Sequence, residues 1–176
     1  MELKDYAKDI KLNIDRVLNT EDGSPGLTET QKWGVALASA YQTKNQELID
    51  FIHGQAKEHI SEEEINATKI ATTLMAMNNI YYRFRSTAEN PEFKQMPVKL
   101  RMSGLAQHGI DKANFELYAL AISALNFCET CINGHVRLVN EHGITNEGVQ
   151  SSIRIAAVIC GAAQALSINY KLGGTK

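Results

Sequence analysis

Asn126-Phe127-Cys128-Glu129-Thr130-Cys131 is a stretch that predicts the start of a helix carrying two thiols. Asn126 and Glu129 are three residues apart, which is the spacing of a capping box, with Asn in place of the usual Ser or Thr. Cys128 would then lie in the first turn, where unpaired backbone amides carry partial positive charge. That charge favours the thiolate form of a cysteine. The stretch therefore predicts a helix that begins with reactive residues.

Cys128 and Cys131 form a C-x-x-C motif, and His135 follows four residues after the second thiol. Thiols at this spacing can close a disulfide over a short loop, and one sulfur can resolve a mixed disulfide that the other has formed. Residues four apart lie on one face of a helix, so His135 can take the proton of Cys131. Because only a thiolate attacks a peroxide or a disulfide, a two-electron redox site is the leading hypothesis.

Two other interpretations of the thiols stay open at this point. The C-x-x-C pair could be half of a zinc site that Cys160 and His135 complete, although the chain has no second C-x-x-C and no paired His motif. The pair could also be two small apolar residues buried on a helix face. Cys160 itself lies in the apolar segment 158–162, and we expect it to be a buried, inert thiol.

Glu116 lies twelve residues before Cys128. Taken alone, it would be a solvated helix carboxylate, because its neighbours Asp111 and Lys112 are typical surface residues. Its position one element before the thiols suggests a role only in combination with them.

One domain over residues 1–176 is expected, because a chain of 176 residues can bury a substantial core but is too short for two ordinary domains. The net charge is −2 and no Lys/Arg cluster of the nucleic-acid type occurs, which argues against nucleic acid as a partner. No apolar run approaches the roughly twenty residues that span a bilayer, and the charged start 1–5 is unlike a secretion signal. We therefore expect a cytoplasmic protein with no membrane partner, in a reducing compartment where paired cysteines are usually catalytic, redox-sensing or metal-bound.

The apolar residues recur at spacings of three and four, which predicts amphipathic helices, whereas no useful length alternates as a strand does. Only three prolines occur in the chain. Three helices are predicted to begin after Thr28, Ser61 and Thr145. The apolar residues that carry this periodicity in the first part of the chain are Ile10, Ile14, Val17, Leu18, Val35, Leu37, Ala38, Tyr41, Leu48, Ile49 and Ile52. The sequence therefore predicts an all-α fold.

A weak internal repeat is visible when the chain is shifted against itself by 84 residues. The segment 60–65 then falls on 144–149, and Ser39-Ala40 falls on Ser123-Ala124. This predicts two related helical repeats, about 28–90 and about 110–170, packed around a pseudo-two-fold axis. Only the second repeat has thiols, since Lys44 and Glu47 stand where Cys128 and Cys131 would be.

Together, Glu116, Cys128, Cys131 and His135 follow the pattern E-x11-C-x-x-C-x3-H, which resembles the signature of the alkyl hydroperoxide reductase AhpD family, within the carboxymuconolactone decarboxylase-like superfamily. The likeness extends over essentially the whole chain. Three further segments resemble the family: the Asn-Asn segment 75–83, the lead-in 109–117 to the glutamate, and the final helix 156–166.

The resemblance implies a compact all-helical domain that assembles as a homotrimer. It also implies an adaptor that reduces an AhpC-type peroxiredoxin with electrons from dihydrolipoamide on a lipoylated acyltransferase. Weak peroxidase activity toward organic hydroperoxides is a further implication, and no bound cofactor or metal is expected.

The family roles map onto the positions of this chain that match the motif. Cys131 would be the attacking sulfur that passes through sulfenic acid, and Cys128 the resolving sulfur and proton donor. Glu116 and His135 would form a proton relay. A helix start would favour Cys128 as the more acidic thiol, but a nearby base outweighs a helix-end effect of roughly 0.3–1 kcal/mol. Some members have a second histidine just before the later cysteine, where this chain has Thr130.

Two rival functions belong to other classes. A lyase of the carboxymuconolactone decarboxylase type would share the helical fold without using a dithiol, so the C-x-x-C motif argues against it. A non-enzymatic redox sensor or assembly subunit would keep the thiols. Re-reduction by dihydrolipoamide, and not by glutathione, would separate the enzyme from the sensor.

Overall fold

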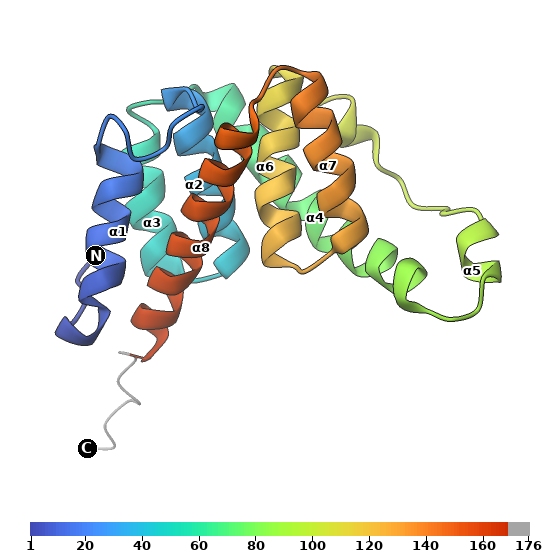
Figure 1. Cartoon of the computed structure of the whole chain (residues 1–176), viewed down its shortest axis with the longest axis horizontal. Helices are drawn as coiled ribbons and strands as arrows, with labels where there is room; N and C mark the ends of the chain where they lie inside the picture. Colours follow the sequence, from blue (N-terminus) through green and yellow to red (C-terminus); the bar gives the residue numbers. More distant parts are fainter. Residues whose placement is uncertain (169–176) are drawn as a thin grey trace.

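The computed structural model describes residues 1–168, and within that range every regular element is a helix (Figure 1). The predicted all-α class is therefore confirmed. The elements are η1 (Asp5–Ala7), α1 (Lys8–Asn19), α2 (Glu29–Thr43), α3 (Gln46–Ala56), α4 (Glu62–Thr87), α5 (Glu92–Gln95), η2 (Ser103–Leu105), α6 (Lys112–Leu125), α7 (Glu129–Glu141) and α8 (Asn146–Ile168).

The helices form two neighbouring groups that meet where α2 and α8 pack on α6 (Figure 1). In the first group α1 packs on α8 and α3 packs on α2, whereas in the second α4 and α7 pack on α6. The short helix α5 lies on a segment that extends away from both groups, and the chain then returns through η2 to the side of α4. One continuous apolar core joins the two groups, and Tyr118 and Phe115 are its largest fully buried side chains.

The three predicted helix starts are confirmed by their capping hydrogen bonds. Thr28 and Gln31 form a complete capping box at the start of α2. The Ser61 hydroxyl accepts from the backbone N–H of Glu64 at 3.3 Å, and the Thr145 hydroxyl accepts from that of Gly148 at 3.2 Å. Each cap satisfies one of the backbone donors that a helix start leaves without an intrahelical partner.

The corner between α6 and α7 differs from its prediction. Phe127 adopts a left-handed conformation (φ 55°), and the backbone N–H groups of Phe127 and Cys128 donate to the carbonyls of Ala124 (3.1 Å) and Ser123 (3.1 Å). These two bonds form a Schellman motif, which ends α6. Cys128 is then the N-cap of α7, because its carbonyl accepts the first helical bond at 2.9 Å from Ile132.

Asn126 is therefore the C-cap of α6, and the prediction that it caps α7 is wrong. Its side chain connects three helices instead. Gln42 of α2 donates to its Oδ1 at 2.6 Å, and its Nδ2 donates to Asn79 Oδ1 of α4 at 2.9 Å. The side chain thus holds the end of α6 against α2 and α4.

α8 corrects the expectation that no segment is apolar enough to cross a membrane. α8 has 23 residues and a mean hydropathy of 1.5 over its most apolar stretch, so by length and composition alone it could cross a membrane. Half of that apolar stretch is buried inside the protein, where α8 packs on α1, α2 and α6. Core helices of soluble proteins can be equally long and apolar, so this one helix is weak support for a membrane span.

The helix bounds agree with the shift of 84 residues. Shifted by that number, the range of α2 falls on α6, that of α3 on α7, and that of α4 on α8. Two contacts also join positions 84 apart. Gln42 bonds to Asn126, and Gly34 lies against the Tyr118 ring so closely that an added Cβ would be 2.2 Å from it. Superposition of the two helix triplets stays a prediction.

Candidate redox site

Cys128 and Cys131 are joined in a disulfide, with their Cα atoms 5.3 Å apart. Cys128 has no exposed surface, whereas Cys131 is 9% exposed. Cys160 is a free and exposed thiol, so the expectation that it is buried is wrong. Within residues 1–168, no group of three or more His, Cys, Asp and Glu side chains is arranged to hold a metal ion.

The bounds of α7 place the two thiols differently from the prediction. Because α7 begins at Glu129, the first turn contains Cys131, and Cys128 is the N-cap just before the helix. The prediction that Cys128 lies in the first turn is therefore wrong. As the N-cap, Cys128 still lies at the positive end of the helix, whereas Cys131 shares α7 with the imidazole four residues later.

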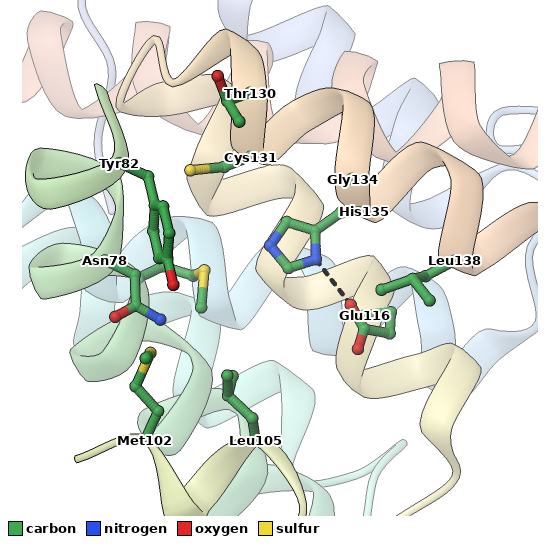
Figure 2. A pocket seen from close by; sticks show the side chains of 11 residues that line it. Asn78, Tyr82, Met102, Leu105, Glu116, Thr130, Cys131, Gly134, His135 and Leu138 are labelled. Carbon is green, nitrogen blue, oxygen red and sulfur yellow. Dashed lines mark hydrogen bonds and ion pairs between the residues drawn. The ribbon is translucent and has the colours of Figure 1, made fainter. Parts of the chain in front are cut away.

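A cavity of about 420 Å³ opens beside Cys131, between α4 and α7 (Figure 2). Its size is within the usual range for small-molecule sites. The side chains around it are mainly apolar, and Cys128 is not among them. The lining residues are Met75, Asn78, Tyr82, Met102, Leu105, Glu116, Thr130, Cys131, Gly134, His135 and Leu138. A ligand in this cavity therefore meets the Cys131 sulfur first.

His135 and Glu116 form a hydrogen-bonded pair on the cavity wall, with 2.6 Å between Nδ1 and Oε2 (Figure 2). The other Glu116 oxygen accepts from Lys112 Nζ at 3.1 Å. Glu116 is only 5% exposed, so the expectation of a solvated carboxylate, which treated this residue alone, is wrong. The pair joins residues of α6 and α7, as the combination of motif residues suggested.

Burial by itself would raise the pKa of Glu116, but the hydrogen bonds and positive charges of His135 and Lys112 outweigh it and hold that pKa below its ordinary value. The carboxylate is therefore ionised at neutral pH. Since it binds Nδ1, it leaves Nε2 of the same imidazole to exchange a proton inside the cavity.

The α4 wall of the cavity was not predicted as part of the site. Met75, Asn78 and Tyr82 are three and four residues apart, so they share one face of α4. The residues 75–83 contributed only a likeness to a family segment, and their helical spacing is the signal that could have placed them together. Met102 and Leu105, which come from the irregular segment around η2, complete the lining without any periodic signal.

Comparison with known proteins adds family relationships. Residues 91–168 match the model of the carboxymuconolactone decarboxylase family. The alkyl hydroperoxide reductase AhpD of Coxiella burnetii (strain RSA 493 / Nine Mile phase I) is 46% identical over 170 residues, which are 97% of this chain and 96% of that protein. The AhpD proteins of Solibacter usitatus and Rhodospirillum centenum are 43% and 41% identical, over 93% and 98% of this chain and 90% of each relative.

Proposed function

Because this chain belongs to the alkyl hydroperoxide reductase AhpD family, we propose that it reduces organic hydroperoxides through the Cys128–Cys131 dithiol and serves an AhpC-type peroxiredoxin. The chain is a peroxide-reducing oxidoreductase with an antioxidant role. One observation carries the proposal for the site. Cys131, one half of the disulfide, opens onto the cavity that His135 and Glu116 also line.

The oxidative half-reaction begins with both cysteines reduced. His135, oriented by Glu116, takes the proton of Cys131, and the thiolate attacks the terminal oxygen of ROOH. The S–O bond forms as the O–O bond breaks, which gives a sulfenic acid on Cys131 and RO⁻. The alkoxide takes the proton from His135 and leaves as ROH. Cys128 then attacks the sulfenic acid, its proton leaves with the hydroxyl as water, and the disulfide closes.

The reductive half-reaction uses a dihydrolipoyl group on a lipoylated acyltransferase as the electron donor. One of its thiolates attacks Cys131, Cys128 leaves as the thiolate, and the second lipoyl thiol then displaces Cys131. Lipoamide is released as its cyclic disulfide and both cysteines are reduced. The same chemistry in the other direction passes two electrons from the dithiol to the disulfide of the AhpC-type partner.

The assignment of Cys131 as the attacking sulfur is supported by three features. It lines the cavity, it is the more exposed of the two cysteines, and it lies on α7 with His135 four residues later. Cys128, fully buried at the corner, suits the resolving role because it needs to meet only Cys131. The homotrimer that the family resemblance implies is part of the proposal, as is the cytoplasmic location expected from the sequence.

Trapping of the sulfenic acid tests the two roles. Cys128→Ser should stop at the sulfenic acid on Cys131 and give a dimedone adduct, whereas Cys131→Ser should give none. Both variants should lose peroxide turnover with dihydrolipoamide, since each lacks one half of the disulfide. Cys160→Ser is the matched control, because it removes the exposed thiol and should keep full activity. The measurements are intact mass and the rate of peroxide loss.

Thiol titration before and after one equivalent of peroxide separates the rival functions. The wild-type chain should fall from three thiols to one, and Cys160→Ser from two to none. A decarboxylase that does not use the dithiol would lose no thiols. Loss of two thiols followed by equal re-reduction with glutathione and dihydrolipoamide would point to a sensor and contradict the proposed enzyme.

A further inference from the structure

The amide of Asn78 is buried in the cavity wall without a hydrogen bond. Asn78 is 4% exposed, and its Oδ1 has no partner among the residues that the structure describes. Its neighbour Asn79 is 1% exposed but fully engaged, since its Nδ2 donates to Ser123 Oγ at 2.9 Å and its Oδ1 accepts from Asn126. Two adjacent amides on one helix therefore differ: one connects helices, and the other faces the cavity unpaired.

An unpaired buried amide is unfavourable for the fold. Native proteins leave few polar atoms in that state, because burial removes the hydrogen bonds that water would supply. An apolar side chain of similar size, such as Leu, would fill the same place without this cost. A hydrogen-bonding ligand that enters the cavity would give Asn78 Oδ1 its missing partner.

The surroundings of Asn78 restrict what that ligand can be. Figure 2 shows the Asn78 amide on the α4 wall below the Tyr82 ring, and the Cys131 sulfur pointing toward the same wall. Met75, Met102 and Leu105 provide apolar surface around the amide. The ligand thus combines a small polar group, placed between an amide and a sulfur, with an apolar body.

We propose that Asn78 binds the –O–OH group of an organic hydroperoxide in this cavity, an inference that rests on the proposed function. The amide offers an acceptor and a donor on neighbouring atoms, and a hydroperoxide offers the matching donor and acceptor on its two oxygens. Oδ1 accepts from the terminal O–H, and Nδ2–H donates to the oxygen that carries the alkyl group. Because Oδ1 is buried, the amide must rotate about its terminal torsion to make this contact, and that torsion is broad in amide side chains.

This contact assists the bond-breaking step. As Cys131 attacks the terminal oxygen, negative charge develops on the alkyl-bearing oxygen, and the Nδ2–H bond to that oxygen becomes stronger. Asn78 itself exchanges no atoms or electrons. The apolar lining receives the alkyl group, so hydrogen peroxide would gain the amide contact alone and should react more slowly than a bulky hydroperoxide.

Asn78→Leu tests the proposal in single-turnover experiments with reduced enzyme and cumene hydroperoxide. The rate constant for sulfenic acid or disulfide formation should fall by about 100-fold, as expected when one donor to a developing oxyanion is removed. Re-reduction of the oxidised variant by dihydrolipoamide should change by less than about threefold. Ile80→Leu, at an exposed position of α4 outside the cavity lining, is the matched control and should leave both rates within about threefold of wild type.

Two further readouts separate binding from a structural role. The melting temperature of Asn78→Leu should equal or exceed that of wild type, because an unpaired polar atom is removed. Its rate should also depend more steeply on the acidity of the leaving alcohol across a series of hydroperoxides. Asn78→Ser replaces the Leu variant if that variant does not fold. Because serine keeps a hydroxyl donor, its peroxide rate should lie between those of wild type and Asn78→Leu.

A peroxide rate in Asn78→Leu equal to that of the Ile80→Leu control would overturn the proposal, as would equal losses in both half-reactions together with a lower melting temperature. Neither result would affect the proposed function, which is tested by the cysteine variants. If wild-type protein reduced no hydroperoxide, the proposed function and this inference would both fail.

Discussion

At the scale of single residues, the pair between Glu116 and His135 explains how one imidazole can serve the thiol. The carboxylate is nearly buried and accepts from Nδ1 at 2.6 Å, which fixes the ring and its tautomer. Lys112 places a positive charge 3.1 Å from the other carboxylate oxygen. The pair therefore performs two tasks, since it orients the base and also stabilises the contact between α6 and α7.

Glu116→Gln should lower the single-turnover peroxide rate by about tenfold to a hundredfold, because the amide keeps the shape but loses the charge that holds the imidazole. It should also lower the free energy of unfolding at pH 7 by about 1–3 kcal/mol, the range for a disrupted buried hydrogen bond to a charged group. Stopped-flow kinetics and urea denaturation measure the two effects.

The stability difference between wild type and Glu116→Gln should depend on pH in one direction. The pKa of Glu116 is lowered in the folded chain, so its contribution is complete above the unfolded carboxyl value of about 4.3 and disappears as pH falls through the lower folded value. Urea midpoints of the two proteins should therefore converge at acid pH. A difference that stays constant between pH 7 and pH 3 would contradict an ionised Glu116.

At the scale of elements, the corner between α6 and α7 positions the thiols. The Schellman motif requires a left-handed residue, and Phe127 occupies that position although Gly is the usual choice. Its side chain is 81% exposed, so it contributes little to the core. The corner is therefore held by backbone hydrogen bonds and by the Asn126 side chain, against the strain at Phe127.

Phe127→Gly should raise the free energy of unfolding by about 0.5–1 kcal/mol, because the left-handed penalty of a side chain with a Cβ exceeds the added freedom of glycine in the unfolded chain. Lys44→Gly is the matched variant, since Lys44 has φ 59° at the C-cap of α2. Thermal denaturation should give similar gains for both. Gain in neither variant would show that these corners are unstrained.

At the scale of the whole molecule, the crossing of α2 and α6 joins the two helix groups. Gly34 allows the Tyr118 ring to lie directly on α2, and the Tyr118 hydroxyl donates to Glu64 Oε2 of α4 at 2.6 Å. Tyr118 is fully buried, and burial together with the Glu64 charge raises its pKa well above the ordinary value. The phenol therefore stays protonated and keeps this hydrogen bond at all working pH values.

Gly34→Ala should lower the free energy of unfolding by about 1–3 kcal/mol or more, because its Cβ would lie 2.2 Å from the Tyr118 ring and force the two helices apart. Gly54→Ala in α3 is the control, since its Cβ would meet nothing within 4 Å, and it should gain up to about 1 kcal/mol. Urea denaturation compares the two. Equal effects would contradict the close crossing.

Much of this architecture could be predicted from local sequence signals. Thr28 and Ser61 were recognisable as caps, because a hydroxyl before a helical run has a direct physical role. The α6–α7 corner could not be predicted, because its left-handed residue is Phe127 and not the glycine that usually marks such a turn. Cys160 was placed in the core because its neighbours are apolar, whereas the packing of α8 turns it outward.

The part of the site that lies on α7 could be predicted from the sequence, but the part that α4 contributes could not. The spacing between Cys131 and His135 is local, and the resemblance supplied Glu116, which is 19 residues from its imidazole partner. The unpaired amide of Asn78 depends on how α4 packs against α7, and no pattern in 75–83 distinguishes it from the structural amide of Asn79.

Cys128 takes part in both helix ends at this corner. Its N–H donates to the last turn of α6, and its carbonyl accepts the first hydrogen bond of α7. The corner is therefore intolerant of insertions. Only Asn126, Phe127 and Cys128 lie between the two helices, so one added amino acid here would break at least one of the bonds that join Cys128 to Ser123 and Ile132. Cys131 and His135 would then lose their fixed position beside the cavity. Engineered loops or tags therefore belong elsewhere in this protein, such as the extended segment around α5.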